Sequence, residues 1–198
     1  LQRRQSELAD AKGTEATLVR EVEAAGKKLH QACAKLTEGR KQAAPRFAKE
    51  VTGQLRGLGF AQSRLEAQIR AEEPGPEGAE TVELLFAPNP GESPRPLRSI
   101  ASSGEMARVM LALKSVLAER DEVPILIFDE VDANVGGETA SAVGAKMAQI
   151  GAQRQVLCIT HLPPVAAAAR THFLVSKEVT GGRTISQIVD RKSTRLNS

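Results

Sequence analysis

Residues 125–128, with the sequence ILIF, run directly into two adjacent carboxylates, Asp129 and Glu130. This apolar run is rich in β-branched residues and follows Pro124, which predicts a strand buried on both faces, as in the parallel sheets of α/β domains. Such sheets bind ligands just beyond the carboxyl ends of their strands. Two neighbouring carboxylates repel each other, and a cation with a reacting water is the usual reason for such a pair. The alternative is a strand that ends in a solvated acidic turn.

A second apolar run, residues 155–160, ends in His161. Between the two runs, a helix is predicted by apolar residues at helical spacing, namely Ala140, Val143, Met147 and Ile150. A strand, a helix and a strand in this order predict a right-handed crossover and a parallel pair of strands. If the strands are neighbours, His161 lies on the same rim as Asp129 and Glu130. A lone histidine is more often structural, but one beside two carboxylates is a candidate for chemistry.

A third signal precedes another predicted helix, whose apolar positions are Met106, Val109, Met110, Leu113 and Leu117. Ser102 and Glu105 have the spacing of a capping box at its start. The first turn of such a helix presents free backbone N–H groups and the positive end of the helix dipole, which together can bind an anion. An ordinary capped helix is the alternative, because capping boxes are common.

Residues 1–44 contain no proline and carry a heptad pattern. Eight of the nine seam positions are apolar, and the nine are Leu8, Ala11, Glu15, Leu18, Val22, Ala25, Leu29, Ala32 and Leu36. This seam predicts a coiled coil whose partner helix belongs to a missing segment or to another subunit, because no second heptad stretch follows. The alternative is a surface helix packed along a domain.

Pro45 is expected to interrupt this helix. A shorter helix is predicted to follow and to end near Gly57 and Gly59. Residues 63–87 then predict a β-hairpin with a long loop over residues 72–78.

Residues 173–189 predict a second hairpin, with a glycine turn. Residues 192–198 follow no pattern and look like non-native sequence, and the chain begins in mid-pattern, which suggests a fragment. The predicted organisation is a coiled-coil helix at 1–44, a folded lobe at 45–191 and a tail at 192–198.

The composition argues against several functions. No apolar run approaches the roughly 20 residues of a membrane span, and the N-terminus lacks a signal-peptide core. The chain has no Trp, no Tyr and five Phe, so an aromatic platform for single-stranded nucleic acid is not expected. A net charge of +3 permits contact with nucleic acid without arguing for it. Cys33 and Cys158 fit reduced, structural thiols of a cytosolic protein.

Three signals thus stand in order along the chain: residues 102–105 before a helix, a strand ending in Asp129 and Glu130, and a strand ending in His161. The set resembles the C-terminal lobe of an ABC-type ATPase head, with its signature motif, Walker B strand, D-loop and switch histidine. The resemblance implies an α/β fold with a parallel-sheet core, flanking helices and β-hairpins, preceded by a coiled-coil helix.

The residues that flank these motifs indicate a more specific family. Residues 100–114, 128–137 and 155–163 resemble the bacterial RecN family of SMC-like DNA-repair ATPases, and the resemblance covers about residues 1–190. Such proteins carry a short coiled coil between the two halves of their ATPase head, and residues 1–44 match the returning helix of that coil.

The resemblance implies a role for each candidate residue. Asp129 would hold Mg²⁺, Glu130 would orient and deprotonate the attacking water, and His161 would contact the γ-phosphate of ATP. The signature and the D-loop would supply further nucleotide-binding positions, which are Ser102, Ser103, Gly104, Glu105, Asp132 and Asn134. In the family, two heads sandwich two ATP molecules, and each signature acts on the ATP held by the opposite head.

Three features depart from the family pattern. Ser103 and Asn134 stand at positions that are usually glycine. The chain also contains no Gly-x-x-x-x-Gly-Lys-Ser/Thr stretch, which would hold the β- and γ-phosphates. In the family that stretch lies in the N-terminal lobe, before the coil. The chain is therefore expected to be half of a head with half of a coil, and inactive alone.

The resemblance implies an ATPase of recombinational DNA double-strand-break repair, in which head engagement and hydrolysis are coupled to DNA binding or bridging. The expected partners are ATP, double-stranded DNA ends or single-stranded overhangs, a second copy of the protein and the N-terminal lobe, in the bacterial cytoplasm at the nucleoid. Two alternatives remain: a non-catalytic coiled-coil assembly module with a vestigial head, and a chromosome-organising SMC-type ATPase. Arg46, Lys49 and Arg56 could meet DNA phosphate or form a solvated helix face.

Overall fold

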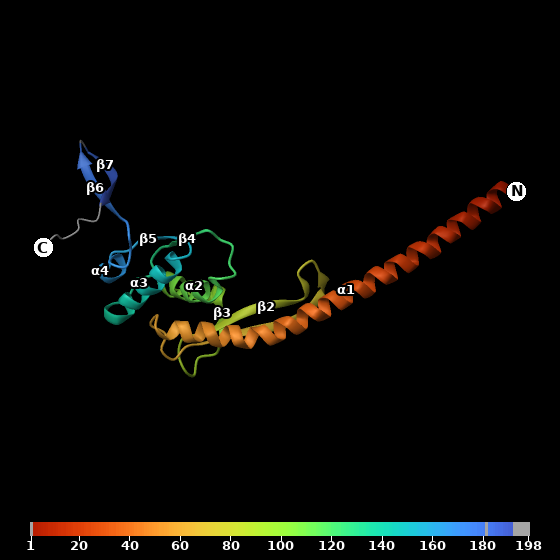
Figure 1. Cartoon of the computed structure of the whole chain (residues 1–198), viewed down its shortest axis with the longest axis horizontal. Coiled ribbons are helices and arrows are strands. Elements are labelled where there is room, and N and C mark those ends of the chain that lie inside the picture. Colours follow the sequence, from red (N-terminus) through yellow and green to blue (C-terminus); the bar gives the residue numbers. More distant parts are fainter. Residues whose placement is uncertain (1, 181, 192–198) are drawn as a thin grey trace. The chain divides into compact units, whose positions relative to one another are not determined.

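The computed structural model describes residues 2–180 and 182–191 (Figure 1). The helices are α1 (Gln2–Arg56), α2 (Ser103–Leu117), α3 (Gly137–Gly151) and α4 (Pro163–Ala166), with a 3-10 turn η1 (Leu97–Ser99). The strands are β1 (Arg64–Gly75), β2 (Gly78–Ala87), β3 (Arg95–Pro96), β4 (Ile125–Phe128), β5 (Gln155–Cys158), β6 (His172–Thr180) and β7 (Arg183–Arg191). They form a β1-β2-β3 sheet, a parallel β4-β5 pair and an antiparallel β6-β7 pair. The predicted tail at 192–198 lies outside the described residues.

The long helix α1 runs through Pro45 without ending, so the predicted interruption at this residue is wrong. A proline inside a helix costs about 3 kcal/mol, because it removes a backbone hydrogen bond and crowds the preceding turn. Packing offsets this cost beyond the proline, where Val51 and Leu55 are completely buried. The helix ends at Arg56, and Gly59 adopts a φ of 92° just beyond it, which confirms the predicted end.

The chain divides into two compact units. The first comprises Leu1–Ala48 and Glu66–Leu85, and the second comprises Lys49–Leu65 and Phe86–Ser198. The first unit thus contains most of α1 and of the β1–β2 hairpin. The second contains the last turns of α1 together with α2, α3, α4 and the strands from β3 onward.

In the first unit, a buried carboxylate joins β2 to α1. Glu80 accepts hydrogen bonds from the Thr37 hydroxyl at 2.7 Å and from the Arg40 guanidinium at 3.1 Å. The Thr37 hydrogen bond, together with the charge of Arg40, holds the pKa of the Glu80 carboxyl below its ordinary value, although burial acts in the opposite direction. The ionised form of Glu80 therefore stabilises the contact between strand and helix.

The β1–β2 hairpin is more regular than the sequence suggests. The predicted loop over residues 72–78 is wrong, because β1 continues to Gly75 and β2 begins at Gly78, which leaves a two-residue turn. Gly78 has a φ of 111°, and an added Cβ there would lie 2.8 Å from the Leu36 side chain of α1. Glycine therefore permits both the turn and the close approach of the hairpin to the helix.

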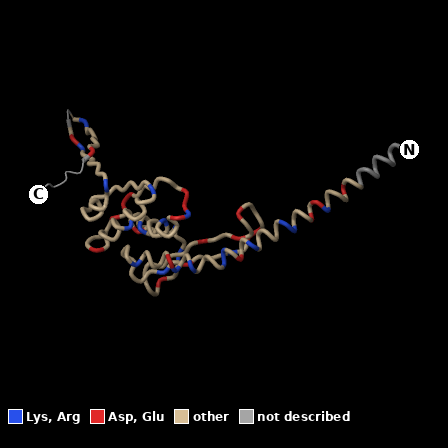
Figure 2. The backbone as a smooth tube through the Cα atoms, in the orientation of Figure 1, with Lys and Arg blue, Asp and Glu red and all other residues tan. Residues whose placement is uncertain are grey.

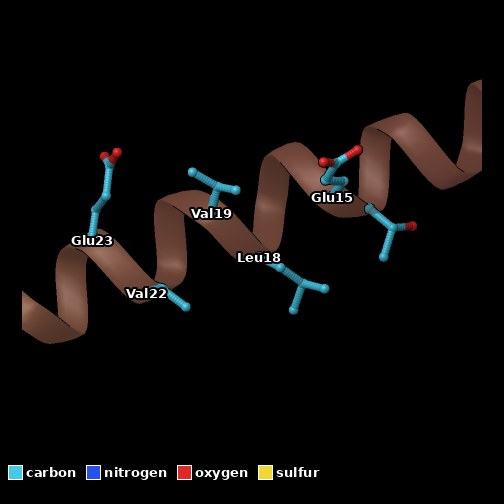
Figure 3. Close-up of a pocket in the computed structure, with 6 residues that line it drawn as sticks. Glu15, Leu18, Val19, Val22 and Glu23 are labelled. Carbon is cyan, nitrogen blue, oxygen red and sulfur yellow. The ribbon is translucent and has the colours of Figure 1, made fainter.

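The seam predicted along α1 faces solvent. Leu18, Val22 and Leu29 are 55%, 71% and 44% exposed. Figure 3 shows that Leu18 and Val22 leave the same side of the helix, whereas Glu23 leaves the other side. Basic and acidic residues are both distributed along the described part of the helix (Figure 2). The side chains of the predicted seam residues Leu8 and Ala11 lie outside the described part of the chain, and the coiled-coil partner remains a prediction.

In the second unit, β4 and β5 are parallel neighbours, as the strand, helix and strand pattern predicts. Ile125 lies opposite Gln155, and Phe128 lies opposite Cys158. The connecting helix α3 packs against α2, α4 and β5. Its four predicted core residues are all buried, and these are Ala140, Val143, Met147 and Ile150.

The prediction that residues 125–128 are buried on both faces is wrong. Leu126 and Phe128 are 8% and 6% exposed, but Ile125 and Ile127 are 47% and 70% exposed. One face of the β4–β5 pair packs against the helices of the second unit, while the residues that the structure describes leave the other face open. The strand is therefore buried on one face within the described part of the chain, although its sequence is apolar at every position.

The strands β6 and β7 confirm the second predicted hairpin, with Thr180 paired with Arg183 across the turn. Gly181, part of the predicted glycine turn, lies outside the described residues. None of the helices in the described part of the chain combines the length and apolar character needed to cross a membrane.

Acid should weaken the link between β2 and α1 through Glu80. Because its folded pKa is depressed, its contribution is present above the unfolded value of 4.5 and is lost as the pH falls through the folded value. We expect Glu80→Gln to be less stable than the wild type at neutral pH, with the difference narrowing under acid. Chemical denaturation of both proteins across this pH range measures the effect.

The matched control is Glu77→Gln at the exposed turn of the same hairpin, which changes the same charge without a buried partner. Its unfolding curves should follow those of the wild type at each pH. A constant difference between Glu80→Gln and the wild type at all pH values would contradict the assigned role of the carboxylate.

Candidate functional site

The candidate site begins where β4 ends. Asp129 and Glu130 follow the strand directly and are both exposed. Glu130 has a φ of 56° and Asn134 a φ of 58°, and these are the non-glycine residues in the left-handed region within the described chain. Asparagine tolerates this conformation, as expected for Asn134, whereas a glutamate in it carries strain of about 1–3 kcal/mol. The loop that follows Glu130 therefore has an unusual backbone that packing must hold in place.

The start of α2 packs on this loop. Ser102 caps the helix by accepting a hydrogen bond from the Glu105 N–H at 3.3 Å, which confirms the predicted cap. The Ser103 hydroxyl donates a hydrogen bond to the Glu130 carboxylate. The signature residues and the acidic pair, separated by more than twenty positions in sequence, are thus in contact within one chain.

Gly104 makes this contact sterically possible. A Cβ added at this position would lie 2.8 Å from the Ala133 Cβ and 3.0 Å from the Glu130 carbonyl oxygen. Both distances are too short for a side chain without displacement of the loop. The glycine is therefore required by the approach of the helix backbone to the loop.

Arg108, one turn further along α2, was not singled out from the sequence. Its guanidinium is buried and donates to the Ala133 carbonyl oxygen at 2.9 Å and to that of Val131 at 3.5 Å. It also lies 5.2 Å from the centroid of the Phe60 ring. Burial lowers the pKa of Arg108 from its ordinary value. Arg108 lies on the buried face of α2 with Gly104, Leu111 and Ala112. The apolar positions predicted from the sequence gave no signal for it, because they include Met110 and Leu117, which are 38% and 37% exposed.

Asp132 joins the same loop to the residues that follow β5. Its carboxylate is 2% exposed and accepts hydrogen bonds from the Thr160 hydroxyl and from the His161 backbone N–H, the latter at 3.2 Å. Burial alone would raise the pKa of Asp132, but these two hydrogen bonds lower it below its ordinary value. Thr160 was also not recognised from the sequence, where it is only a polar residue between an apolar run and a histidine.

The histidine itself points outward. The His161 side chain is 75% exposed, and its Nδ1 lies 3.6 Å from an Asp132 carboxylate oxygen. The parallel pairing continues past the strands, since the Ile159 N–H donates to the Phe128 carbonyl oxygen at 3.0 Å. His161 therefore lies at the same end of the strand pair as the acidic loop.

The carboxylates of this rim act on the thiol of β5, and Asp129 is accessible to a cation. Burial, together with the charges of Asp132 and Asp129, raises the pKa of the Cys158 thiol to about 11. Among the described residues, no group of three His, Cys, Asp or Glu side chains is arranged to hold a metal ion by itself. Mg²⁺ is commonly bound by one or two carboxylates, with phosphate oxygens and waters completing its shell. The exposed Asp129 carboxylate fits such a partial set of ligands.

Comparison with solved structures identifies the fold. The Smc head domain of Pyrococcus yayanosii, with a coiled coil and joint, has a TM-score of 0.56 and 20% identity, over 80% of this chain and 28% of that one. The Smc head domain of Pyrococcus furiosus, with an extended coiled coil, has a TM-score of 0.51 and 17% identity, over 73% of this chain and 34% of that one. The fold is therefore that of the C-terminal lobe of an SMC-type head domain.

Comparison with curated sequences is more specific, although no family model matches. The DNA repair protein RecN of Xylella fastidiosa is 46% identical over 164 residues, which are 81% of this chain and 29% of that protein. RecN of Treponema pallidum is 41% identical over 190 residues, which are 92% of this chain and 33% of that protein. The chain belongs to the RecN family, and it spans about a third of the length of these relatives.

Replacing Gly104 by alanine should destabilise the second unit by about 1–3 kcal/mol, because the new methyl group would meet Ala133 and the Glu130 carbonyl. The matched control is Gly53→Ala in α1, where nothing lies within 4 Å of the added Cβ. That substitution should stabilise the chain by about 0.5–1 kcal/mol through helix propensity. Denaturant unfolding of the three proteins measures both effects, and equal stabilities of wild type and Gly104→Ala would contradict the described packing.

Proposed function

We propose that this chain supplies the signature and Walker B side of a RecN-type ATPase that acts in the repair of DNA double-strand breaks. The observation that carries the proposal is the gathering of three separate motifs at one end of the β4–β5 pair. Ser103 contacts Glu130, and Asp132 contacts the backbone of His161. The curated relatives, which are DNA repair proteins, support the assignment to repair.

In the proposed reaction, Glu130 orients the attacking water and accepts its proton, and His161 donates a hydrogen bond to the γ-phosphate. Asp129 would hold Mg²⁺, and the bound ion would supply neutralisation of the charge on the phosphates. Catalysis would then consist mostly of positioning and charge neutralisation, as in other phosphoryl transfers.

The signature would act on the nucleotide of a second head. Ser102, Ser103, Gly104 and Glu105 lie at the N-terminus of α2, where backbone N–H groups and the helix dipole favour an anion. In the described state the Ser103 hydroxyl is engaged by Glu130 of the same chain. Head engagement would therefore exchange this carboxylate for the γ-phosphate, which frees Glu130 for the water.

The phosphates themselves would be held by a glycine-rich loop on the N-terminal lobe that the resemblance to the family implies. The exposed seam of α1 would pair with the outgoing helix of a coiled coil. The heads joined to this coil would then clasp or bridge DNA. The proposed location is the cytoplasm, at the nucleoid. Arg46, Lys49 and Arg56 could contact DNA phosphate, or form a solvated helix face. Recombinational repair and homodimerisation through the heads are part of the same proposal.

A second candidate function is a non-catalytic assembly module. Two observations favour it. The apolar seam residues of α1 are exposed and could bind another helix. In addition, the Ser103 hydroxyl is hydrogen-bonded to Glu130, the carboxylate that hydrolysis would require. A chromosome-organising SMC-type ATPase would share the Smc-like fold, but the RecN relatives favour repair over that role.

The chain alone should show no ATP turnover above background, and addition of a polypeptide that carries the N-terminal lobe should restore it. A steady-state phosphate-release assay measures both conditions, with the N-terminal lobe alone as the control. Robust turnover by the isolated chain would contradict the half-head proposal. A lack of turnover in the complemented mixture, with assembly shown by gel filtration, would favour the assembly module.

Glu130→Gln in the complemented ATPase should lower kcat by at least about 10³-fold while ATP-bound dimers still form, because the amide cannot accept the proton of the attacking water. Glu138→Gln, at an exposed position in the first turn of α3, removes the same charge nearby and should leave kcat unchanged. Phosphate release and light scattering measure turnover and dimers. Normal turnover by Glu130→Gln would contradict the role of this residue.

A further inference from the structure

The buried carboxylate of Asp132 is directed at its own chain. It is 2% exposed, and one of its oxygens accepts from both the Thr160 hydroxyl and the His161 N–H. A carboxylate that binds nucleotide would need to be accessible from solvent, as the exposed Asp129 is. We propose that Asp132 is a positioning residue that, through Thr160, fixes His161 relative to the acidic loop. This inference rests on the proposed function of His161.

The contact fixes the backbone on both sides of the histidine. Thr160 donates its hydroxyl hydrogen to Asp132, and the same oxygen accepts from the Leu162 N–H at 3.1 Å. The His161 N–H, which lies between them, is held by Asp132 at 3.2 Å. Hydrogen bonds to an ionised acceptor are stronger than neutral ones. Residues 160–162 are therefore anchored at three successive positions.

The exposed imidazole depends on this anchor. The His161 side chain is 75% exposed, and the polar contact that the structure gives it is the 3.6 Å approach to Asp132. Packing leaves its direction largely unspecified, so the direction of the imidazole follows from the backbone conformation at 160–162. Removal of the Asp132 carboxylate would take away two of the hydrogen bonds that hold the turn carrying His161.

The other side of the loop is held by α2. Arg108 donates to the carbonyl oxygens of Val131 and Ala133, which flank Asp132 in sequence. Asp132 is thus fixed from both directions, and it lies two residues after Glu130. A movement of the loop that carries Glu130 would therefore also move His161, which links the group that orients water to the group that contacts phosphate.

The contact can be tested on the chain itself by hydrogen exchange. Thr160→Val keeps the shape of the side chain and removes the hydroxyl donor, and Asp132→Ala removes the acceptor. We expect the His161 and Leu162 amides to exchange faster by on the order of tenfold in both variants, which corresponds to the loss of about one hydrogen bond. Exchange in β4 should be unchanged, which shows that the fold persists. Unaltered exchange at His161 in both variants would overturn the inference.

The catalytic consequence is measured in a RecN-length protein that carries this segment. Thr160→Val should lower kcat for ATP hydrolysis by roughly 10- to 100-fold, because it misplaces a group that acts in the transition state. The KM for ATP should stay unchanged, and Thr160→Ser should restore most of the rate. Thr171→Val, an exposed threonine outside the site, is the matched control and should behave as wild type.

His161→Ala in the same protein distinguishes a failure of the inference about Asp132 from a failure of the proposed role of His161. A large loss with His161→Ala and none with Thr160→Val would overturn the role of Asp132 and leave the proposed function standing. No loss with His161→Ala would overturn the assigned role of the histidine, and that of Asp132 with it. A raised KM for ATP in Asp132→Ala, with unchanged exchange at His161, would show that Asp132 binds nucleotide directly.

Discussion

The close approach of α2 to the loop after β4 is the contact on which the whole rim depends. Gly104 allows the helix backbone to touch the loop, and Arg108 then binds the carbonyl oxygens of Val131 and Ala133. Burying a guanidinium is costly unless polar groups replace its hydration, and the two carbonyls with the Phe60 ring supply part of that replacement. Its Nε has no hydrogen-bond partner among the described residues. The signature turn and the acidic loop are thereby fixed relative to each other before any ligand binds.

The carboxylates of the loop divide between two physical tasks. Asp129 is exposed and remains available to a cation, whereas Asp132 is buried and satisfied by groups from the turn after β5. Glu130 stands between them in a strained backbone conformation, engaged by Ser103. Strain of this kind persists only where surrounding contacts hold it, and such residues concentrate at functional sites. The local conformation therefore agrees with the role proposed for Glu130.

Much of this arrangement follows from local patterns in the sequence. The cap at Ser102, the crossover helix α3 and the parallel pair β4–β5 each rest on hydrogen bonding or periodicity within a short segment. Predictions that required knowledge of distant neighbours were less successful. The helix continues through Pro45 because packing beyond it outweighs the lost hydrogen bond. The strand at 125–128 is exposed on one face, since this chain covers it on one side.

The sequence by itself determined the order of the motifs and their elements, because capping, periodicity and strand pattern act over a few residues. Only the tertiary structure decided which charged groups are buried. Glu80 and Arg108 look like ordinary surface residues in the sequence, and Asp132 was expected to bind nucleotide. Each is instead buried in the fold and bound by groups distant along the chain. Burial of a charge is set by partners that folding brings together, and no short segment of the sequence specifies them.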